Sequence, residues 1–278
     1  GLSKLLQSVK PEMVSLNFGE YYTGKQPVQL FEQLTAWARE QGANGRQLSG
    51  SIDFDPLLDW NEPPLAELAD LVKSCAEQYP AFRPLQVNAK AFHSGPERIV
   101  EELAMTIAKG NEYLARLQEH GLQPSTVNAH MQFGLSISKS YFVEIAKLRA
   151  VRLLWANVLK GYGLSGGATY LVVHFAAETQ DEQKNTNIIR ASTQAMSAVI
   201  GGADRLYVLP SDHIDQKGYS PFSLRIGRNL QHLLKMESHL HRVVDPGAGS
   251  YYIEELTRQL CEKAWKRFQQ LDAERVFG

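Results

Sequence analysis

The chain has 278 residues, 44% of them hydrophobic, which is enough to bury the core of one sizeable α/β domain. Its net charge is −1 and its basic residues are dispersed, which argues against binding to nucleic acid or to a membrane surface. Cys75 and Cys261 lack CxxC spacing, so we expect no disulfide framework and a cytoplasmic location. The apolar runs are only as long as strands, so we expect no membrane span.

Predicted strands and helices alternate along the chain. The predicted strands are 13–18, 48–54, 85–93, 126–133, 169–175 and 205–209. The predicted helices are 28–41, 63–79, 96–120, 138–159, 181–200, 221–239 and 250–268. Six strand-helix alternations predict an α/β fold with a parallel sheet and helices outside it. An eight-stranded barrel would need two more strands, so we expect residues 1–278 to form a single TIM-barrel-like (β/α) domain of about six units.

Three histidines lie near the predicted carboxyl ends of successive strands: His93, His130 and His174. In parallel α/β proteins that end of the sheet handles ligands, so we expect the three side chains to meet at one mouth. A single histidine of this kind is more often structural, but three indicate a polar pocket. A metal site using all three is the alternative, although no HxH or HExxH spacing supports it.

Charged residues also lie inside strands that otherwise look buried. Asp53, Asp55 and Lys90 are such residues, and a buried charge needs a partner. We expect Lys90 to pair with Asp53 or Asp55 on the inner side of the sheet; a Schiff-base lysine is the alternative. We expect the charged residues of helix 138–159 to form a solvated or interface surface: Glu144, Lys147, Arg149 and Arg152.

Three long segments closely resemble the substrate-binding barrel of methylmalonyl-CoA mutases. They are FVEIAKLRAVRLLWANV (142–158), RIGRNLQHLLKMES (225–238) and RVVDPGAGSYYIEELT (242–257). The resemblance runs in unbroken order from about Ser15 to Phe268. It implies an eight-stranded barrel threaded by the CoA ester, of which this chain resembles strands three to eight, so we expect it to be N-terminally incomplete. The family's D-x-H-x-x-G cobalamin motif does not occur in the 278 residues, so we expect no cobalamin-binding domain here.

The resemblance implies that two active-site histidines are retained. The family's Y-H pair, whose histidine bonds the substrate thioester carbonyl, matches Phe92-His93, where the tyrosine hydroxyl is lost. The family's H-S-Q-T-S-G begins at His174 and loses its glutamine. By the same resemblance, substrate contacts would involve Ser51, Asp53, Phe92 and His130, with His93 and His174 as the retained catalytic positions.

Other family positions are replaced. In G-T-I-Q-N-D, which reads Gly50 to Asp55, the glutamine has become Asp53, and a small serine of the family has become Lys90. The arginine that meets the CoA tail falls on His130, and a second arginine has no counterpart in the segment 61–64. The asparagine and glutamate near the adenosyl group fall on Pro210 and Ile214. The scaffold is kept while the cations for substrate are lost.

This pattern resembles the small, non-catalytic subunit of the heterodimeric mutases. The resemblance implies a chain that binds no cofactor itself and supports a catalytic subunit carrying adenosylcobalamin, which isomerises methylmalonyl-CoA and succinyl-CoA. The alternatives are a substrate-binding module of a split acyl-CoA mutase, which would still need the substrate arginines, and the three-histidine metal enzyme.

Two structural expectations follow. A six-stranded part of a barrel has two unpaired edges, which proteins normally cover. We therefore expect the strands 13–18 and 205–209 to be covered by loops, by a catalytic subunit or by self-association. We also expect Lys90 and its aspartate partner to block the route that CoA would take.

Overall fold

The centre of the molecule is one parallel sheet that curls into an open half-barrel. The computed structural model describes residues 2–19, 26–214 and 218–277. Its strands are hydrogen-bonded in chain order, β1-β2-β3-β4-β5-β6, and every neighbouring pair is parallel. They are β1 (Ser15–Phe18), β2 (Ser49–Phe54), β3 (Phe82–Asn88), β4 (Met131–Ile137), β5 (Leu171–Phe175) and β6 (Arg205–Tyr207). The TIM-barrel-like α/β prediction is confirmed.

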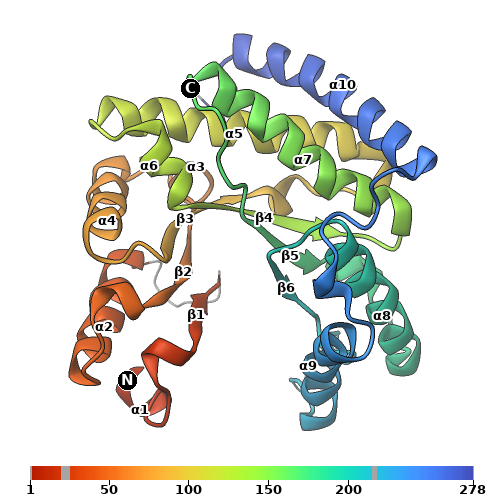
Figure 1. The fold of residues 1–278 in the computed structure, drawn as a ribbon, viewed down its shortest axis with the longest axis horizontal. Coiled ribbons are helices and arrows are strands. Elements are labelled where there is room, and N and C mark those ends of the chain that lie inside the picture. The colour runs from red at the N-terminus through yellow and green to blue at the C-terminus, as the bar shows by residue number, and fades with distance from the viewer. Residues whose placement is uncertain (1, 20–25, 215–217, 278) are drawn as a thin grey trace.

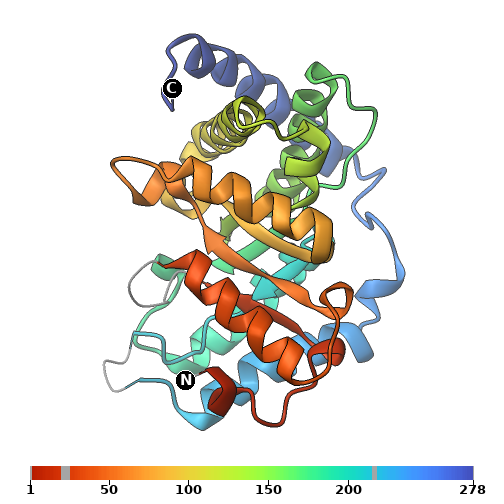
Figure 2. The same ribbon diagram turned by 90° about the vertical axis from the view of Figure 1, so that its left-hand side faces the viewer.

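The helices cover the convex side of this sheet (Figure 1). They are α1 (Leu2–Leu5), α2 (Pro27–Glu40), α3 (Pro56–Asp59), α4 (Leu65–Gln78), α5 (Ile99–Glu119), α6 (Pro124–Ala129), α7 (Tyr141–Gly161), α8 (Lys184–Ile200), α9 (Pro221–Met236) and α10 (Tyr251–Ala273). Helix α10 packs on α5 and α7 as a further outer layer. Figure 2 shows α2 and α4 over the N-terminal half of the sheet, with the two termini at opposite ends of the molecule. Among the described helices, none is long and apolar enough to span a membrane.

The two faces of the sheet differ in chemistry, as strand β4 illustrates. Its alternate residues Met131, Phe133, Leu135 and Ile137 belong to the core under the helices, whereas Gln132 and Ser136 belong to the other set. The same alternation makes the concave face polar on the other strands: Asn17, Ser51, Asp53, Gln86 and His174. Apolar branched residues usually fill the inside of a TIM barrel. A polar concave face therefore indicates a cavity lined by polar side chains rather than a second hydrophobic core.

Two predicted boundaries are wrong near the middle of the sheet. The segment predicted as strand 126–133 begins as α6, which Pro124 opens, and the true strand β4 starts at Met131. Strand β3 ends at Asn88, and the 3-10 turn η3 (Ala89–Phe92) follows it, so Lys90 and His93 lie beyond the strand. As a result of these two errors, the predicted positions of Lys90, His93 and His130 relative to the mouth of the half-barrel differ from those in the structure.

The edge strands β1 and β6 are short and are joined by a side chain across the hollow. Within the described ranges, β1 pairs only with β2 and β6 only with β5. Arg205 of β6 reaches Asn17 of β1, and its Nη1 donates to Ser51 Oγ of β2 at 2.7 Å. Whether a second chain covers these edges stays a prediction.

Candidate functional site

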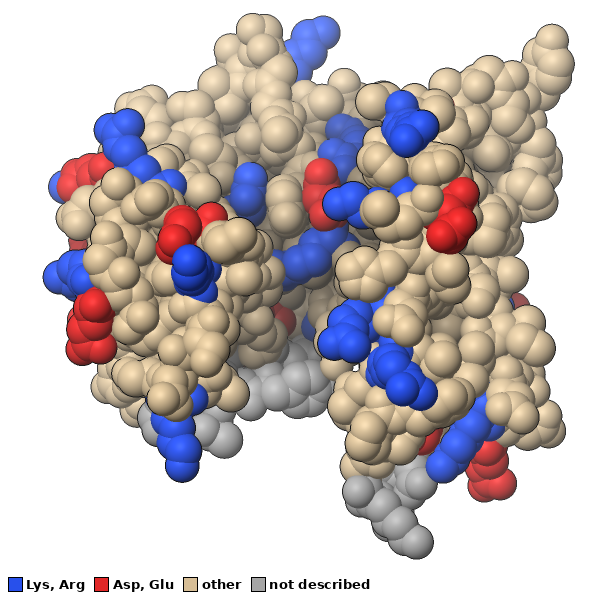
Figure 3. Space-filling model, turned by 60° about the horizontal axis from the view of Figure 1, so that its bottom comes forward, with Lys and Arg blue, Asp and Glu red and all other residues tan. Residues whose placement is uncertain are grey.

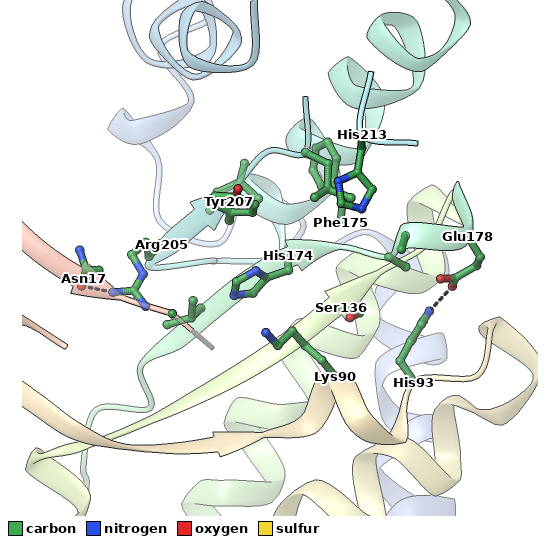
Figure 4. A pocket seen from close by; sticks show the side chains of 16 residues that line it. Asn17, Lys90, His93, Ser136, His174, Phe175, Glu178, Arg205, Tyr207 and His213 are labelled. Atoms are coloured by element: carbon green, nitrogen blue, oxygen red, sulfur yellow. Dashed lines mark hydrogen bonds and ion pairs between the residues drawn. The ribbon is translucent and has the colours of Figure 1, made fainter. Parts of the chain in front are cut away.

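A cavity of about 460 Å³ opens at the carboxyl ends of the strands; we call it the mouth cavity. It is lined by residues of β1, β4, β5 and β6 and of the segments that follow β1, β3, β5 and β6. The polar members of this lining are Asn17, Lys90, His93, Ser136, His174, Glu178, Arg205, Tyr207 and His213. Figure 4 shows that Lys90, His174 and Arg205 point toward one another inside it. The sequence prediction of a polar pocket is confirmed for His93 and His174, which both line this cavity.

His93 joins one wall of the mouth cavity to helix α5. Its Nδ1 lies 2.9 Å from Glu102 Oε2, and its Nε2 lies 2.9 Å from Glu178 Oε1 in the turn η5 (Ala177–Thr179). Burial opposes protonation of the ring, but the hydrogen bond and charge of Glu102, assisted by Glu178, outweigh it and raise the pKa of His93 above its usual value. The imidazolium form of His93 therefore links two carboxylates, one of them buried.

Glu102 belongs to a larger group of buried charges, the Glu102 cluster, formed by Glu102, Glu144, Lys147 and His93. Lys147 Nζ lies 3.2 Å from Glu102 Oε1 and 2.7 Å from Glu144 Oε2, and all three side chains are fully buried. Lys147 also donates to the backbone oxygen of Ser136 at 2.5 Å, while Glu144 accepts from the Ser138 amide. The expectation that Glu144 and Lys147 lie on a solvated or interface surface is wrong, because helix α5 supplies their partner.

His174 differs from His93 in having cations instead of carboxylates beside it. Burial, followed by the charges of Lys90 and Arg205, lowers the pKa of His174 to about 3. Its ring also contacts that of Tyr207, with 5.5 Å between the centroids. His174 is therefore a neutral imidazole at physiological pH, able to donate one hydrogen bond and to accept another.

The predicted ion pair of Lys90 exists, and it uses Asp53. Lys90 Nζ lies 4.0 Å from Asp53 Oδ2, with both side chains largely buried. Asp55 has other partners: it accepts from Lys109 Nζ and Tyr113 Oη, each at 2.5 Å, and from the amide of Asn88 at 2.7 Å. The expectation that Lys90 pairs with one of the two aspartates is therefore confirmed, and the aspartate is Asp53.

His130 does not reach the mouth. It follows α6 and precedes β4, so it lies at the amino end of the sheet, where its Nδ1 is 2.7 Å from the backbone oxygen of Phe82. Burial and the charge of Arg83 lower the pKa of His130, so it supplies no cation. The predicted meeting of three histidines is wrong, and the described part of the chain holds no group of three or more His, Cys, Asp or Glu side chains suited to a metal.

Phe92 and Ser51, two predicted substrate contacts, have protein partners. The Phe92 ring lies 4.9 Å from Lys109 Nζ and 5.9 Å from the ring of Phe277, on the side of the helices. Ser51 Oγ donates to Asn17 Oδ1 at 2.9 Å and accepts from Arg205. Neither residue is among the described lining of the mouth cavity.

The sequence argument missed Arg205, the second cation of the mouth cavity. Burial lowers the pKa of this guanidinium below its usual value. The signal was available, because Arg205 is a charge in a predicted strand, as Lys90 appeared to be. Glu102 and Glu178 gave no such signal, since their contact with His93 depends on tertiary packing.

Two positions matched to the adenosyl contacts of the mutase barrel do not fit that group. Pro210 is buried and Ile214 is about half exposed. Neither side chain carries a hydrogen-bonding atom for a ribose or an adenine. The residues present at these positions therefore give no reason to route a cofactor step through this chain.

Comparisons with known proteins agree with the geometry. The family model described as methylmalonyl-CoA mutase matches residues 2–275. A protein named methylmalonyl-CoA mutase small subunit from Porphyromonas gingivalis is 36% identical over 277 residues, covering 96% of this chain and 44% of its own length. A small subunit from Streptomyces virginiae is 31% identical, with coverage of 98% and 45%, and a methylmalonyl-CoA mutase from Rhizobium meliloti is 34% identical, with 84% and 35%.

The chain thus spans less than half the length of these relatives, and nearly all of it aligns with them. The extent of the family match, the order of the strands and the two histidines at the mouth all agree. The chain belongs to the methylmalonyl-CoA mutase family.

Proposed function

We propose that this chain acts as a small subunit of a methylmalonyl-CoA mutase and supports a catalytic subunit without turning over substrate itself. The observation that carries the proposal is the inner face of the half-barrel, where the Lys90–Asp53 pair stands at positions that hold a small serine and a neutral glutamine in the resembling mutase barrels. Relatives named small subunit align with nearly the whole chain, which supports the same assignment.

The chemistry of the site favours a non-catalytic role for this chain. A mutase site needs a dry tunnel and cations for the CoA phosphates. Here His130 is neutral and bonded to a backbone oxygen at the far end of the sheet, and residues 61–64 contain no arginine. Lys90 and Asp53 bring charge into the passage and would block a threaded CoA ester. The split-mutase alternative needs the missing arginines and is therefore not favoured.

We infer that the partner is the catalytic subunit and that adenosylcobalamin resides in that subunit. Within the described residues, the edge strands β1 and β6 pair on one side only, so their outer edges could accept a second chain. This arrangement would satisfy strand edges that a monomer leaves open, and it explains why a barrel with an altered site would be retained.

Reconstitution tests the proposal. The chain is mixed with the catalytic subunit encoded in the same genome, and complex formation is followed by native mass spectrometry and by the thermal midpoint of the catalytic subunit. We expect a one-to-one complex and a raised midpoint, while the chain alone, given adenosylcobalamin and methylmalonyl-CoA, shows no turnover. Turnover by this chain alone, or no association with the catalytic subunit, would contradict the proposal.

A further inference from the structure

Residues Arg275–Phe277, which we call the strap, turn back from the end of helix α10 (Figure 2). Arg275 has a φ of 51°, a left-handed conformation that residues other than glycine rarely adopt. Its amide donates to the backbone oxygen of Asp272 at 3.1 Å, and the amide of Val276 donates to that of Leu271 at 3.3 Å. These are the two hydrogen bonds of a Schellman motif, which ends a helix and reverses the chain. The strap therefore leaves the direction of α10 and returns to α5.

One arginine of α5 holds the strap. Arg116 Nη2 donates to the backbone oxygen of Phe277 at 2.9 Å, and Arg116 Nε donates to Glu112 Oε1. Glu112 lies one turn before Arg116 on the same helix, so it fixes the direction of the guanidinium. Because a planar guanidinium that bonds a carboxylate and a carbonyl at once has a fixed orientation, the strap is held at a fixed position on α5.

The ring of Phe277 reaches the turn that follows strand β3. Its centroid lies 5.9 Å from that of the Phe92 ring, at an interplanar angle of 55°. The Phe92 ring also lies 4.9 Å from Lys109 Nζ, a buried cation of α5 that donates to the backbone oxygen of Asn88 at the end of β3. Phe92 thus contacts both the strap and a cation that is hydrogen-bonded to the strand.

The turn η3, to which Phe92 belongs, leads into the mouth of the half-barrel. Lys90 lies in η3 and His93 follows it, and both line the mouth cavity. Figure 3 shows the hollow between the two arms of the half-barrel, with Lys and Arg side chains gathered in it. The amide of His93 donates to the backbone oxygen of Lys90 at 3.2 Å and closes the turn. Phe92 therefore connects this turn with the strap, which lies on the side of the helices.

The strap itself is lightly packed. Arg275 is exposed, Val276 is 44% exposed and Phe277 is half-buried. The three residues also line a cavity of about 610 Å³ together with residues of α5 and α10. Segments with exposed side chains and few buried contacts open at a lower free energy than the core does. We therefore expect the strap to open before the sheet unfolds.

We propose that the strap is a conformational latch for the mouth of the half-barrel. Its closed form, held by Arg116, fixes the turn η3 and the backbone of His93, and its opening loosens this wall of the cavity. Arg116 and Phe277 are thus positioning residues that act through Phe92. The inference goes beyond the proposed role as a supporting subunit, because every contact that carries it lies within this chain.

Hydrogen exchange of the full 278-residue chain, measured for single amides by NMR, tests the latch. We expect Phe277→Ala to speed the exchange of the His93 amide by about tenfold, the effect of losing one aromatic pair. Amides of the core strand β5 should keep their rates. Tyr251→Ala is the matched control, because it removes an aromatic ring that is 94% exposed at the other end of α10. We expect this control to change neither rate.

Substitutions at Arg275 should shift the latch in both directions. Glycine adopts the left-handed conformation without steric cost, so Arg275→Gly should favour the closed form and slow the exchange of the His93 amide. A β-branched side chain disfavours that conformation, so Arg275→Ile should favour the open form and speed the exchange. Arg116→Gln should speed it as well, whereas Arg116→Lys keeps a cationic donor and should have a smaller effect.

A thermal melt of each variant confirms that it is folded before exchange is measured, and the exposed changes at Arg275 decide the question if Phe277→Ala does not fold. Unchanged exchange of the His93 amide in Arg275→Ile and Phe277→Ala would overturn the inference. An equal increase at His93 and in β5 would also overturn it, because the strap would then contribute to overall stability alone. These measurements need no catalytic subunit, so a failure here is distinct from a failure of the proposed subunit role.

Discussion

The Glu102 cluster and the mouth cavity both hold charged side chains at the same end of the sheet, but these side chains differ in their surroundings. In the cluster, Glu102, Glu144 and Lys147 are fully buried and hydrogen-bonded. In the mouth cavity, Lys90 and Arg205 line a hollow; Lys90 lies 4.0 Å from Asp53, and Arg205 is hydrogen-bonded to Asn17 and Ser51. The cluster has the properties of a structural joint between sheet and helices, whereas the charged groups of the cavity line an open space.

His93 connects the two regions. One ring nitrogen faces buried Glu102, and the other faces Glu178, whose side chain is 59% exposed. Two carboxylates of this chain thus hold both nitrogens of His93. These contacts give His93 a structural role in joining the turn after β3 to α5 and to η5.

The largest effect should come from removing a charge from the cluster. Lys147→Met leaves Glu144 buried without its cation and Glu102 with His93 alone, which we expect to lower the free energy of unfolding by about 3–5 kcal/mol. Urea denaturation measures this loss. The control Lys160→Met lies on the same helix and is exposed, so it should leave the unfolding midpoint nearly unchanged. A loss no greater than that of the control would show that the cluster contributes little to stability.

The contrast between these regions was only partly accessible from the sequence. Alternating apolar residues placed five of the strands and only the start of β4, and capping residues gave the long helices within a few positions. The prediction missed α6 because the short segment 124–129 fits either element, and only Pro124 marked a helix start. His130 consequently appeared at the wrong end of strand β4.

Charge placement was harder to predict than secondary structure. Lys90 was recognised because a lysine near a buried strand needs a partner, and Asp53 was within reach of it. Lys147 seemed solvated because its partner Glu102 lies 45 positions earlier, on another helix. Sequence periodicity reports which face of a helix is apolar, but it does not reveal a second helix that brings the opposite charge.

A smaller effect should come from the Lys90–Asp53 pair, which is longer and less enclosed than the cluster. We expect Lys90→Met to destabilise the chain more than the double variant with Asp53→Leu, because the single change leaves a buried carboxylate without its cation. A coupling of about 1–2 kcal/mol in a double-mutant cycle, measured by urea denaturation, is expected. In a control cycle that combines Lys160→Met with Asp53→Leu, the two changes in the free energy of unfolding should be additive. Additivity for Lys90 as well would rule out the pair as a plug of the hollow.

The last effect concerns pH, and His93 and His174 should act with opposite sign. The carboxylates raise the pKa of His93 in the folded chain, above its value of about 6.5 in the unfolded chain. The stability from protonated His93 is therefore full below about pH 6.5 and is lost as the pH rises through the folded pKa. His130 and His174 have lowered pKa values in the folded chain. Their contribution is full above about pH 6.5 and is lost as the pH falls.

Unfolding midpoints in urea, measured across this range, separate these contributions. We expect His93→Gln to abolish the loss of stability as the pH rises. We expect Glu178→Gln to make this loss smaller, because Glu178 accounts for part of the raised pKa of His93. The exposed change His232→Gln on α9 is the control and should retain the alkaline loss. His174→Gln should instead flatten the acidic side, because a neutral glutamine gains no proton when the chain unfolds. If the loss of stability at alkaline pH persisted unchanged in His93→Gln, protonated His93 would not link Glu102 to Glu178. The connection between the cluster and the cavity would then depend on packing alone.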